Sequence, residues 1–304
     1  MTQKLIPVLC IVFLLSCTSR KETSYTIETS TPIIAVVNYP LYYCAKSIGG
    51  DHVKVYLPAI DGDPAYWNPN AKQVINFQKA DLILTNGAGY AKWIEKVSLP
   101  SSKIVNTSIG FIDQWIASDE ELVHSHGPEG EHSHKGVAST TWLNFDFAKL
   151  QAKATYEAII KLFPDKIDEL DPNYKHLLSK LNELDKKSIR VSKKIGDQYL
   201  LASHPVYQYF QSGYELNIIS KHLEPDKRPT TAMWDDLQKT THDYNVHIMI
   251  WEDIPIEEIT LKLNELDLGI AVFNPCANKP KTGDFIDVMN ANLNQLDQLI
   301  EAGK

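Results

Sequence analysis

The sequence predicts an α/β fold in which two parallel-sheet lobes are joined by one long helix. Short runs of branched apolar residues alternate with helical patterns, this alternation occurs twice, and a purely helical stretch separates the two occurrences. The chain has 304 residues, of which 43% are hydrophobic and 22% charged, a composition that suits two globular lobes. We expect an N-terminal lobe at 32–145, a helical connector at 146–196 and a C-terminal lobe at 197–304.

Each predicted lobe contains four strand signals. The runs are almost continuously apolar and do not alternate, which indicates strands buried on both faces of a parallel sheet. They are Ile33–Val37, Val53–Leu57, Leu82–Leu84, Ile104–Val105, Tyr199–Ala202, Leu216–Ile219, Val246–Trp251 and Leu268–Phe273. Helical patterns lie between them, at Leu41–Ile48, Ala71–Gln78, Pro205–Gln211, Thr231–His242, Ile256–Leu266 and Asp284–Ala302. Helices should therefore cover both faces of each sheet.

The connector contains two predicted helices. The first runs from Asp146 to Phe163 and stops at Pro164. The second begins at Asp171 and Pro172, with aspartate as N-cap and proline at the first helical position, and ends at Gly196. About 23 residues at ~1.5 Å each give a rod of about 35 Å. Such a rod would limit hinge motion between the lobes.

The first residues are a targeting segment. Lys4 precedes the apolar stretch Leu5–Leu15, which is much shorter than the ~20 residues that span a bilayer. Leu14-Leu15-Ser16-Cys17 resembles a bacterial lipobox, so we expect a lipoprotein signal peptide at 1–16 and lipid on Cys17. Residues 17–31 are polar and rich in Ser and Thr, as in a flexible tether. We predict an extracytoplasmic protein that is lipid-anchored to a bacterial membrane, in the periplasm or on the cell surface.

Charge and motifs exclude several classes of function. The formal net charge of -8 argues against nucleic acid as a partner. No Gly-x-Ser-x-Gly elbow of a serine hydrolase is present, and Lys92 occupies the position where a dinucleotide fingerprint starting at Gly87 needs its third glycine. We therefore do not expect an enzyme. Cys44 and Cys276 either form a disulfide or are two separate buried thiols, and the sequence leaves both open.

A histidine-rich segment interrupts the N-terminal lobe at 124–134. Glycine and proline break any helical or strand pattern there, so we expect a mobile loop over Val123–Val137. Two His-x-His pairs place imidazoles close enough to share a divalent cation, whereas the alternative is a polar loop without a ligand. The four histidines are His124, His126, His132 and His134.

Several motifs occur in an order and spacing that resemble a known family. They are Asn38-Tyr39-Pro40-Leu41-Tyr42, Gly62-Asp63-Pro64-Ala65-Tyr66-Trp67-Asn68-Pro69, Ala80–Gly87, Thr141-Trp142-Leu143-Asn144, Ser203-His204, Val272-Phe273-Asn274-Pro275 and Phe285–Leu296. Together with the histidine-rich loop they resemble the zinc/manganese ABC-transporter substrate-binding proteins, the metal-binding lipoproteins of cluster A-I. The resemblance implies two lobes joined by a backbone helix. It also implies that the protein, as a monomer, captures a divalent metal ion and delivers it to a permease and its ATPase. Zn²⁺ is the expected ion, and Mn²⁺ is the alternative.

The ligand positions implied by the resemblance are largely altered in this chain. Ala65 and Thr140 stand where the family carries histidine, and Asn274 stands where it carries a carboxylate. Only His204 keeps a strong donor at its expected position. Because Zn²⁺ normally has four nitrogen, sulfur or carboxylate ligands, we expect a degenerate site.

Several alternatives for the cargo site stay open. Glu252 or Asp63 could join His204, His132 or His134 could fold over the site from the loop, or Cys276 could bind as a soft ligand. The histidine-rich loop could also be a metal scavenger without a cleft site. A changed cargo, an organic molecule or a chelated metal, would suit aromatic residues in the cleft-forming segments. These aromatics are Tyr39, Tyr66, Trp67, Trp142, Tyr207 and Trp251.

Overall fold

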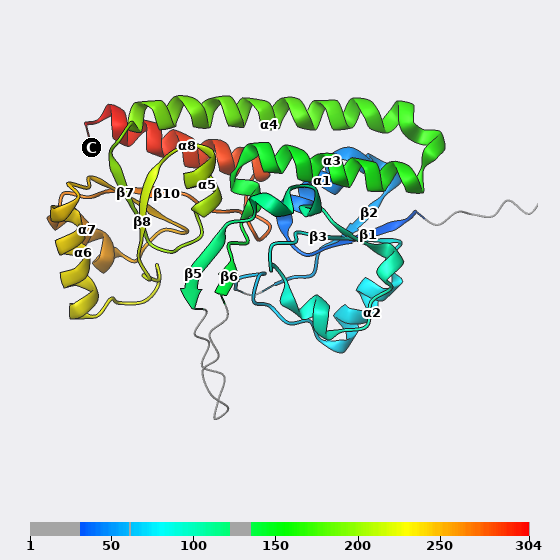
Figure 1. The fold of residues 1–304 in the computed structure, drawn as a ribbon, viewed down its shortest axis with the longest axis horizontal. Coiled ribbons are helices and arrows are strands. Elements are labelled where there is room, and N and C mark those ends of the chain that lie inside the picture. Colours follow the sequence, from blue (N-terminus) through cyan, green and yellow to red (C-terminus); the bar gives the residue numbers. More distant parts are fainter. Residues whose placement is uncertain (1–30, 61, 122–134, 304) are drawn as a thin grey trace, which may run out of the picture. The chain divides into compact units, whose positions relative to one another are not determined.

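The computed structural model describes residues 31–60, 62–121 and 135–303, and its first sheet lies near the N-terminal end of this range (Figure 1). Four parallel strands, β1 (Ile33–Val36), β2 (Lys54–Tyr56), β3 (Leu82–Thr85) and β4 (Ile104–Asn106), pair in the order β2-β1-β3-β4. Every residue of β3 is buried, as its continuous apolar run predicted. Helices α1 (Tyr39–Gly49) and α2 (Ala71–Lys79) lie on opposite faces of this sheet (Figure 1).

The second sheet repeats this arrangement. Its strands β7 (Tyr199–Ala202), β8 (Asn217–Ser220), β9 (Ile248–Trp251) and β10 (Gly269–Val272) are parallel, in the order β10-β9-β7-β8. Three helices accompany it, α5 (Gln208–Gly213), α6 (Thr231–Asp243) and α7 (Glu257–Glu265). The predicted α/β class and the parallel sheets are therefore confirmed.

Helix α5 begins three residues later than the sequence predicted. The amide of Val206 donates to the carbonyl oxygen of His204 at 3.0 Å, which closes a tight turn that a helix cannot contain. Pro205 therefore belongs to the loop after β7 and not to the helix.

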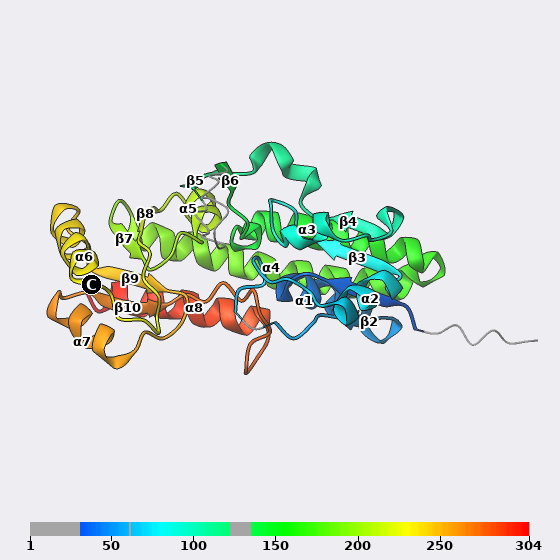
Figure 2. The ribbon, with the colours of Figure 1, turned by 90° about the horizontal axis from the view of Figure 1, so that it is seen from below.

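A layer of long helices joins the two sheets. Helix α4 (Ile167–Ile195) packs against α1, α3 (Phe145–Leu162) and α8 (Phe285–Glu301), along the top of Figure 1. Figure 2 shows α8 and α1 one after the other along the length of α4, and the two helices contact each other where they meet. The buried face of α4 carries Leu170, Leu177, Leu181, Leu184, Val191 and Ile195.

The predicted start of the long helix was wrong. Helix α4 begins at Ile167 and has 29 residues, which gives a length of about 43 Å at ~1.5 Å per residue. Pro172 lies inside the helix, where it removes one hydrogen bond, to the carbonyl of Asp168, near the exposed amino end. The fully buried side chain of Leu170 anchors this first turn. Burial of one leucine stabilises by ~1.5–3 kcal/mol, which is of the same order as the ~3 kcal/mol that a proline inside a helix costs.

A two-stranded hairpin was not predicted. Strands β5 (Ala117–Glu121) and β6 (Lys135–Val137) pair antiparallel, with Ala117 opposite Val137. The mobile-loop prediction is therefore wrong for residues 135–137. No apolar alternation marks either strand in the sequence, and backbone pairing joins the two. The predicted ligands His124, His126, His132 and His134 lie outside the described residues, as do the signal peptide, Cys17 and the tether up to residue 30.

The two cysteines of the described chain are both buried and free. Burial raises the pKa of each thiol, Cys44 and Cys276, to about 12. The alternative of two separate thiols is therefore the correct one. Within residues 31–60, 62–121 and 135–303, no helix is long and apolar enough to cross a membrane.

Candidate metal-binding cavity

A cavity of about 880 Å³ lies where loops leave the carboxyl ends of both sheets. In open parallel α/β sheets this edge is the usual place for a ligand, most of all where the strand order reverses. In the second sheet the reversal falls between β7 and β9, which are neighbours. His204 follows β7 and Glu252 follows β9, so both side chains enter the cavity at the switch point.

His204 is the centre of the polar wall. Its Nδ1 lies 3.4 Å from Oε1 of Glu252, and its Nε2 lies 3.7 Å from Oε1 of Glu224. Glu224 follows β8, the neighbour of β7 on the other side. The sheet order β9-β7-β8 therefore places a carboxylate on each side of one imidazole. The His204 side chain is 25% exposed, so it remains reachable from the cavity.

The cavity wall is electrostatically negative. Burial, and then the charges of Asp63 and Glu224, raise the pKa of Glu252 from 4.5 to about 7. Burial also raises the pKa of Asp63, although the hydrogen bond from the amide of Ala65 and the nearby His204 oppose this rise. Within the described part of the chain no lysine or arginine lines the cavity. Carboxylates that repel one another without a neutralising side chain favour a bound cation.

All five cleft residues predicted as ligands line this one cavity: Asp63, Thr140, His204, Glu252 and Asn274. Two of them already use their oxygen atoms. The Thr140 hydroxyl donates to the carbonyl oxygen of Val206, and Oδ1 of Asn274 accepts from the amide of Cys276 at 2.7 Å. Ala65, at the third altered position, also lines the cavity and offers no donor atom.

Among the polar residues of the cavity that sequence reasoning missed, one imidazole and one carboxylate are potential metal ligands. His222 and Glu224 follow β8, as Glu252 follows β9, so the strand-end rule makes them candidates, but only the position of β8 beside β7 brings them to the cavity. The ring centroids of His222 and His204 lie 6.0 Å apart, with ring planes at 78°. In their present positions, no three His, Cys, Asp or Glu side chains of the described ranges are gathered closely enough to hold a metal ion.

Besides Asp63, the first sheet contributes a buried amide at the end of β3. Asn86, at the carboxyl end of β3, is fully buried, and its Oδ1 accepts from Nε2 of Gln151 at 3.1 Å. Its Nδ2 donates to the carbonyl oxygen of Ser139 at 2.8 Å, which fixes the 138–142 segment against this sheet. The side-chain amide of Asn86 therefore shapes the cavity by holding the 138–142 segment in place.

Of the aromatic residues predicted near the cleft, some line the cavity and others lie in the core. Tyr66 and Trp142 line the cavity, whereas Trp251 and Tyr207 are almost fully buried in the protein interior. Tyr90, which the sequence did not single out, also lines the cavity at 6% exposure, and its hydroxyl has no hydrogen-bond partner. Its ring contacts Trp142 edge-on.

Comparison with known proteins gives a consistent result. The family model described as "Zinc-uptake complex component A periplasmic", ZnuA, matches residues 34–299. The high-affinity zinc uptake system protein ZnuA of Bacillus subtilis (strain 168) is 27% identical over 271 residues, which cover 85% of this chain and 84% of that protein. The zinc-binding lipoprotein AdcA of Streptococcus pneumoniae (strain ATCC BAA-255 / R6) is 25% identical over 302 residues, or 95% of this chain but 59% of AdcA.

Solved structures share the fold. The metal-dependent lipoprotein YcdH of Bacillus subtilis superposes with a TM-score of 0.75 at 24% identity, covering 88% of this chain and 98% of YcdH. The Zn(II)-bound ZnuA-like domain of Streptococcus pneumoniae AdcA superposes with a TM-score of 0.74 at 20% identity, covering 90% of this chain and all of that domain.

Proposed function

Because this chain belongs to the family of periplasmic component A of zinc-uptake complexes, we propose that it captures a divalent metal ion, Zn²⁺ first, and delivers it to an ABC permease. One observation carries the proposal. The cavity at the strand ends brings His204 together with three carboxylates, Asp63, Glu224 and Glu252, and with no lysine or arginine among its described lining residues. Imidazole and carboxylate are the ligands that Zn²⁺ prefers when no thiolate is present.

The proposed action is capture and release, without any covalent step. Glu252 and His204 are about one quarter to one third exposed, so an ion bound there can leave without unfolding of the wall. The buried face of α4 packs along helices associated with both sheets, which suits small shifts between lobes better than wide opening. The permease and its ATPase are the partners that this role requires.

Two parts of the proposal concern segments outside the described residues. Lipid on Cys17 would keep the protein at the outer side of the membrane, beside its permease. The histidines of 124–134 would bind divalent ions weakly and so raise the rate of capture, since two His-x-His pairs can each share a divalent cation.

The test is a zinc and manganese titration of the chain that starts after Cys17, made with and without alanine at His124, His126, His132 and His134. We expect one tightly bound zinc per chain that survives loss of the loop histidines, with weaker additional zinc only in the unaltered chain. Loss of all zinc binding with the loop histidines would leave a scavenging loop and would refute a cavity site. Calorimetry gives both the stoichiometry and the affinity.

A second candidate is a chelated metal or a small organic ligand. The cavity volume of about 880 Å³ is far larger than one ion needs and falls in the range of ~300–1,000 Å³ that is usual for small-molecule sites. The buried Tyr90 hydroxyl without a partner would suit a polar atom of such a ligand. If neither Zn²⁺ nor Mn²⁺ alone binds the apoprotein, binding of a zinc chelate of histidine or citrate in the same titration would support this candidate.

A further inference from the structure

We propose that the captured ion is held from the second sheet alone, by Nε2 of His204 with Glu224 and His222, while Glu252 holds the ring from its other nitrogen. This inference rests on the proposed function and replaces the altered ligand positions with residues at different places in the chain. Ala65, Thr140 and Asn274 take no part in it. A fourth ligand position is left for water.

The two nitrogens of His204 assign different roles to its two carboxylates. Glu252 lies against Nδ1 at 3.4 Å, and Glu224 lies against Nε2 at 3.7 Å. One ion cannot bind both nitrogens of the same ring, because they point in diverging directions. An ion at Nε2 therefore has Glu224 as its neighbour. Glu252 then accepts the Nδ1–H, as carboxylates behind zinc-bound histidines commonly do, and acts as a positioning residue.

The segment that carries His222 and Glu224 is fixed to the strand end that carries His204. The amide of Lys221 donates to the carbonyl oxygen of Ala202 at 2.8 Å, and the amide of Leu223 donates to that of Ser203 at 2.9 Å. Leu223 is 2% exposed and anchors the segment in the core. His222 and Glu224 flank Leu223 and both line the cavity. The three proposed ligands thus sit on one rigid unit.

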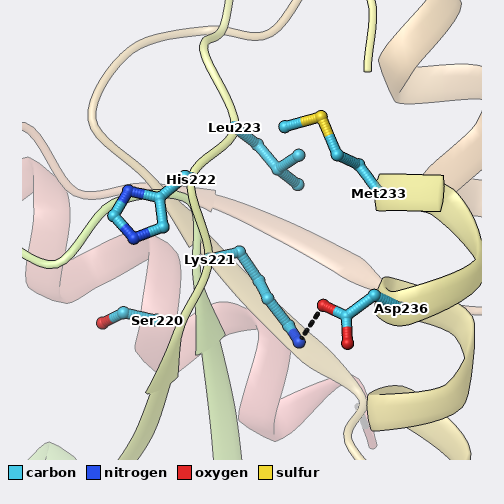
Figure 3. Close-up of a pocket in the computed structure, with 6 residues that line it drawn as sticks. All are labelled: Ser220, Lys221, His222, Leu223, Met233 and Asp236. Atoms are coloured by element: carbon cyan, nitrogen blue, oxygen red, sulfur yellow. Dashed lines mark hydrogen bonds and ion pairs between the residues drawn. The ribbon is translucent and has the colours of Figure 1, made fainter. Parts of the chain in front are cut away.

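Of the residues that the structure describes, the two lysines of this segment do not neutralise the cluster. Figure 3 shows the ammonium of Lys221 directed away from the His222 ring and toward Asp236, which it meets at 2.5 Å. Lys221 also donates to Thr240 at 2.6 Å. Lys227 approaches Glu224 only at 4.0 Å and is largely exposed, so that pair is weak and easily displaced.

The imidazole rings of His204 and His222 need to move only a short way to bind one zinc ion. Two imidazoles on one tetrahedral zinc, with Zn–N distances of ~2.0–2.1 Å, have ring centres roughly 5 Å apart. The centroids of His204 and His222 lie 6.0 Å apart. His222 and Glu224 are exposed residues, so rotation of their side chains can close the site without moving the backbone. This explains why three donors are near one another but not yet converged.

The test uses the chain that starts after Cys17, with alanine at the four loop histidines as the parent. Zinc affinity is measured by competition with a chelating dye, and X-ray absorption at the zinc edge counts the imidazole ligands. We expect two imidazoles in the parent. His222→Ala should leave one, and His222→Ala and Glu224→Gln should each weaken binding about 100-fold or more. Glu252→Gln should weaken binding ~10–100-fold and keep two imidazoles.

The matched controls are His176→Ala and Glu95→Gln, which remove an exposed imidazole and an exposed carboxylate elsewhere, and which should leave zinc affinity unchanged. A parent that binds zinc through one imidazole, with full affinity after His222→Ala and Glu224→Gln, overturns this inference and leaves the proposed function intact. A parent that binds no zinc overturns both. Far-ultraviolet circular dichroism confirms that each variant is folded.

Discussion

Replacing Glu252 by glutamine tests the electrostatics of the cavity without any metal. The protein raises the pKa of this carboxyl from 4.5 to about 7, so the folded state holds the proton more tightly than the unfolded state. Below pH 4.5 the group is protonated in both states. Between pH 4.5 and 7 the unfolded state loses its proton first, and stability falls as the pH rises; above pH 7 the whole cost remains.

The magnitude follows from this rise in pKa. At 1.36 kcal/mol for each unit of pKa, the rise from 4.5 to about 7 sets an upper bound of about 3 kcal/mol on the stability lost at high pH. Because the Glu252 side chain is 32% exposed and therefore partly screened by water, we expect about 2 kcal/mol. Glutamine has no charge to lose. The Glu252→Gln apoprotein should therefore be about 2 kcal/mol more stable than the unaltered protein at pH 8, and nearly equal to it at pH 4.5.

The assay is urea unfolding with a metal chelator present, at pH 8 and pH 4.5, with Asp253→Asn as the control one residue away. The control should change neither free energy of unfolding. Excess zinc should reverse the order at pH 8, because the unaltered protein binds zinc more tightly and is stabilised more. A Glu252→Gln apoprotein that is less stable at pH 8, or that shows the same difference at both pH values, would refute this account of the cavity.

Three further predictions concern the ligand, the pH and the backbone. His204→Ala should weaken zinc binding about 100-fold in a competition titration, since four ligands share roughly 10–16 kcal/mol, while His176→Ala should not; equal effects would remove His204 from the site. Zinc affinity should fall below pH 7 by about tenfold per pH unit in calorimetry, because Glu252 must lose its proton; a flat profile would contradict this. Gly87→Ala should cost about 1–3 kcal/mol of stability in thermal unfolding, because φ is +75° and a Cβ would meet Ser108 Oγ at 2.2 Å. Gly110→Ala, with open space at its Cβ, is the control, and an equally large loss there would refute the steric argument.

The strands were predictable because buried parallel strands leave a strong local signal. Tyr199–Ala202 was predicted with its observed bounds, because a short apolar run between turn signals is typical of a buried strand. One failed case was decided by a tertiary contact and the other by a local turn. Burial of Leu170 extends α4 past Pro172, and the turn at His204 delays α5. The hydrophobic periodicity of the sequence signals neither.

The site was predictable in part. His204, Glu252 and Asp63 were selected because they end strands or lie in matching motifs, and the structure brings them to one cavity. His222 and Glu224 escaped because their recruitment depends on strand order, with β8 beside β7, and sequence does not give strand order. The assignment of Glu252 to Nδ1 and Glu224 to Nε2 likewise requires coordinates.

Anomalous diffraction at the zinc edge, on crystals of the zinc-loaded chain with the four loop histidines changed to alanine, tests the central claim most directly. The account predicts one zinc per chain in the cavity, at ~2.0–2.1 Å from Nε2 of His204, with Glu252 hydrogen-bonded to Nδ1 of the same ring. An anomalous peak elsewhere, or an empty cavity in a zinc-saturated crystal, would contradict it.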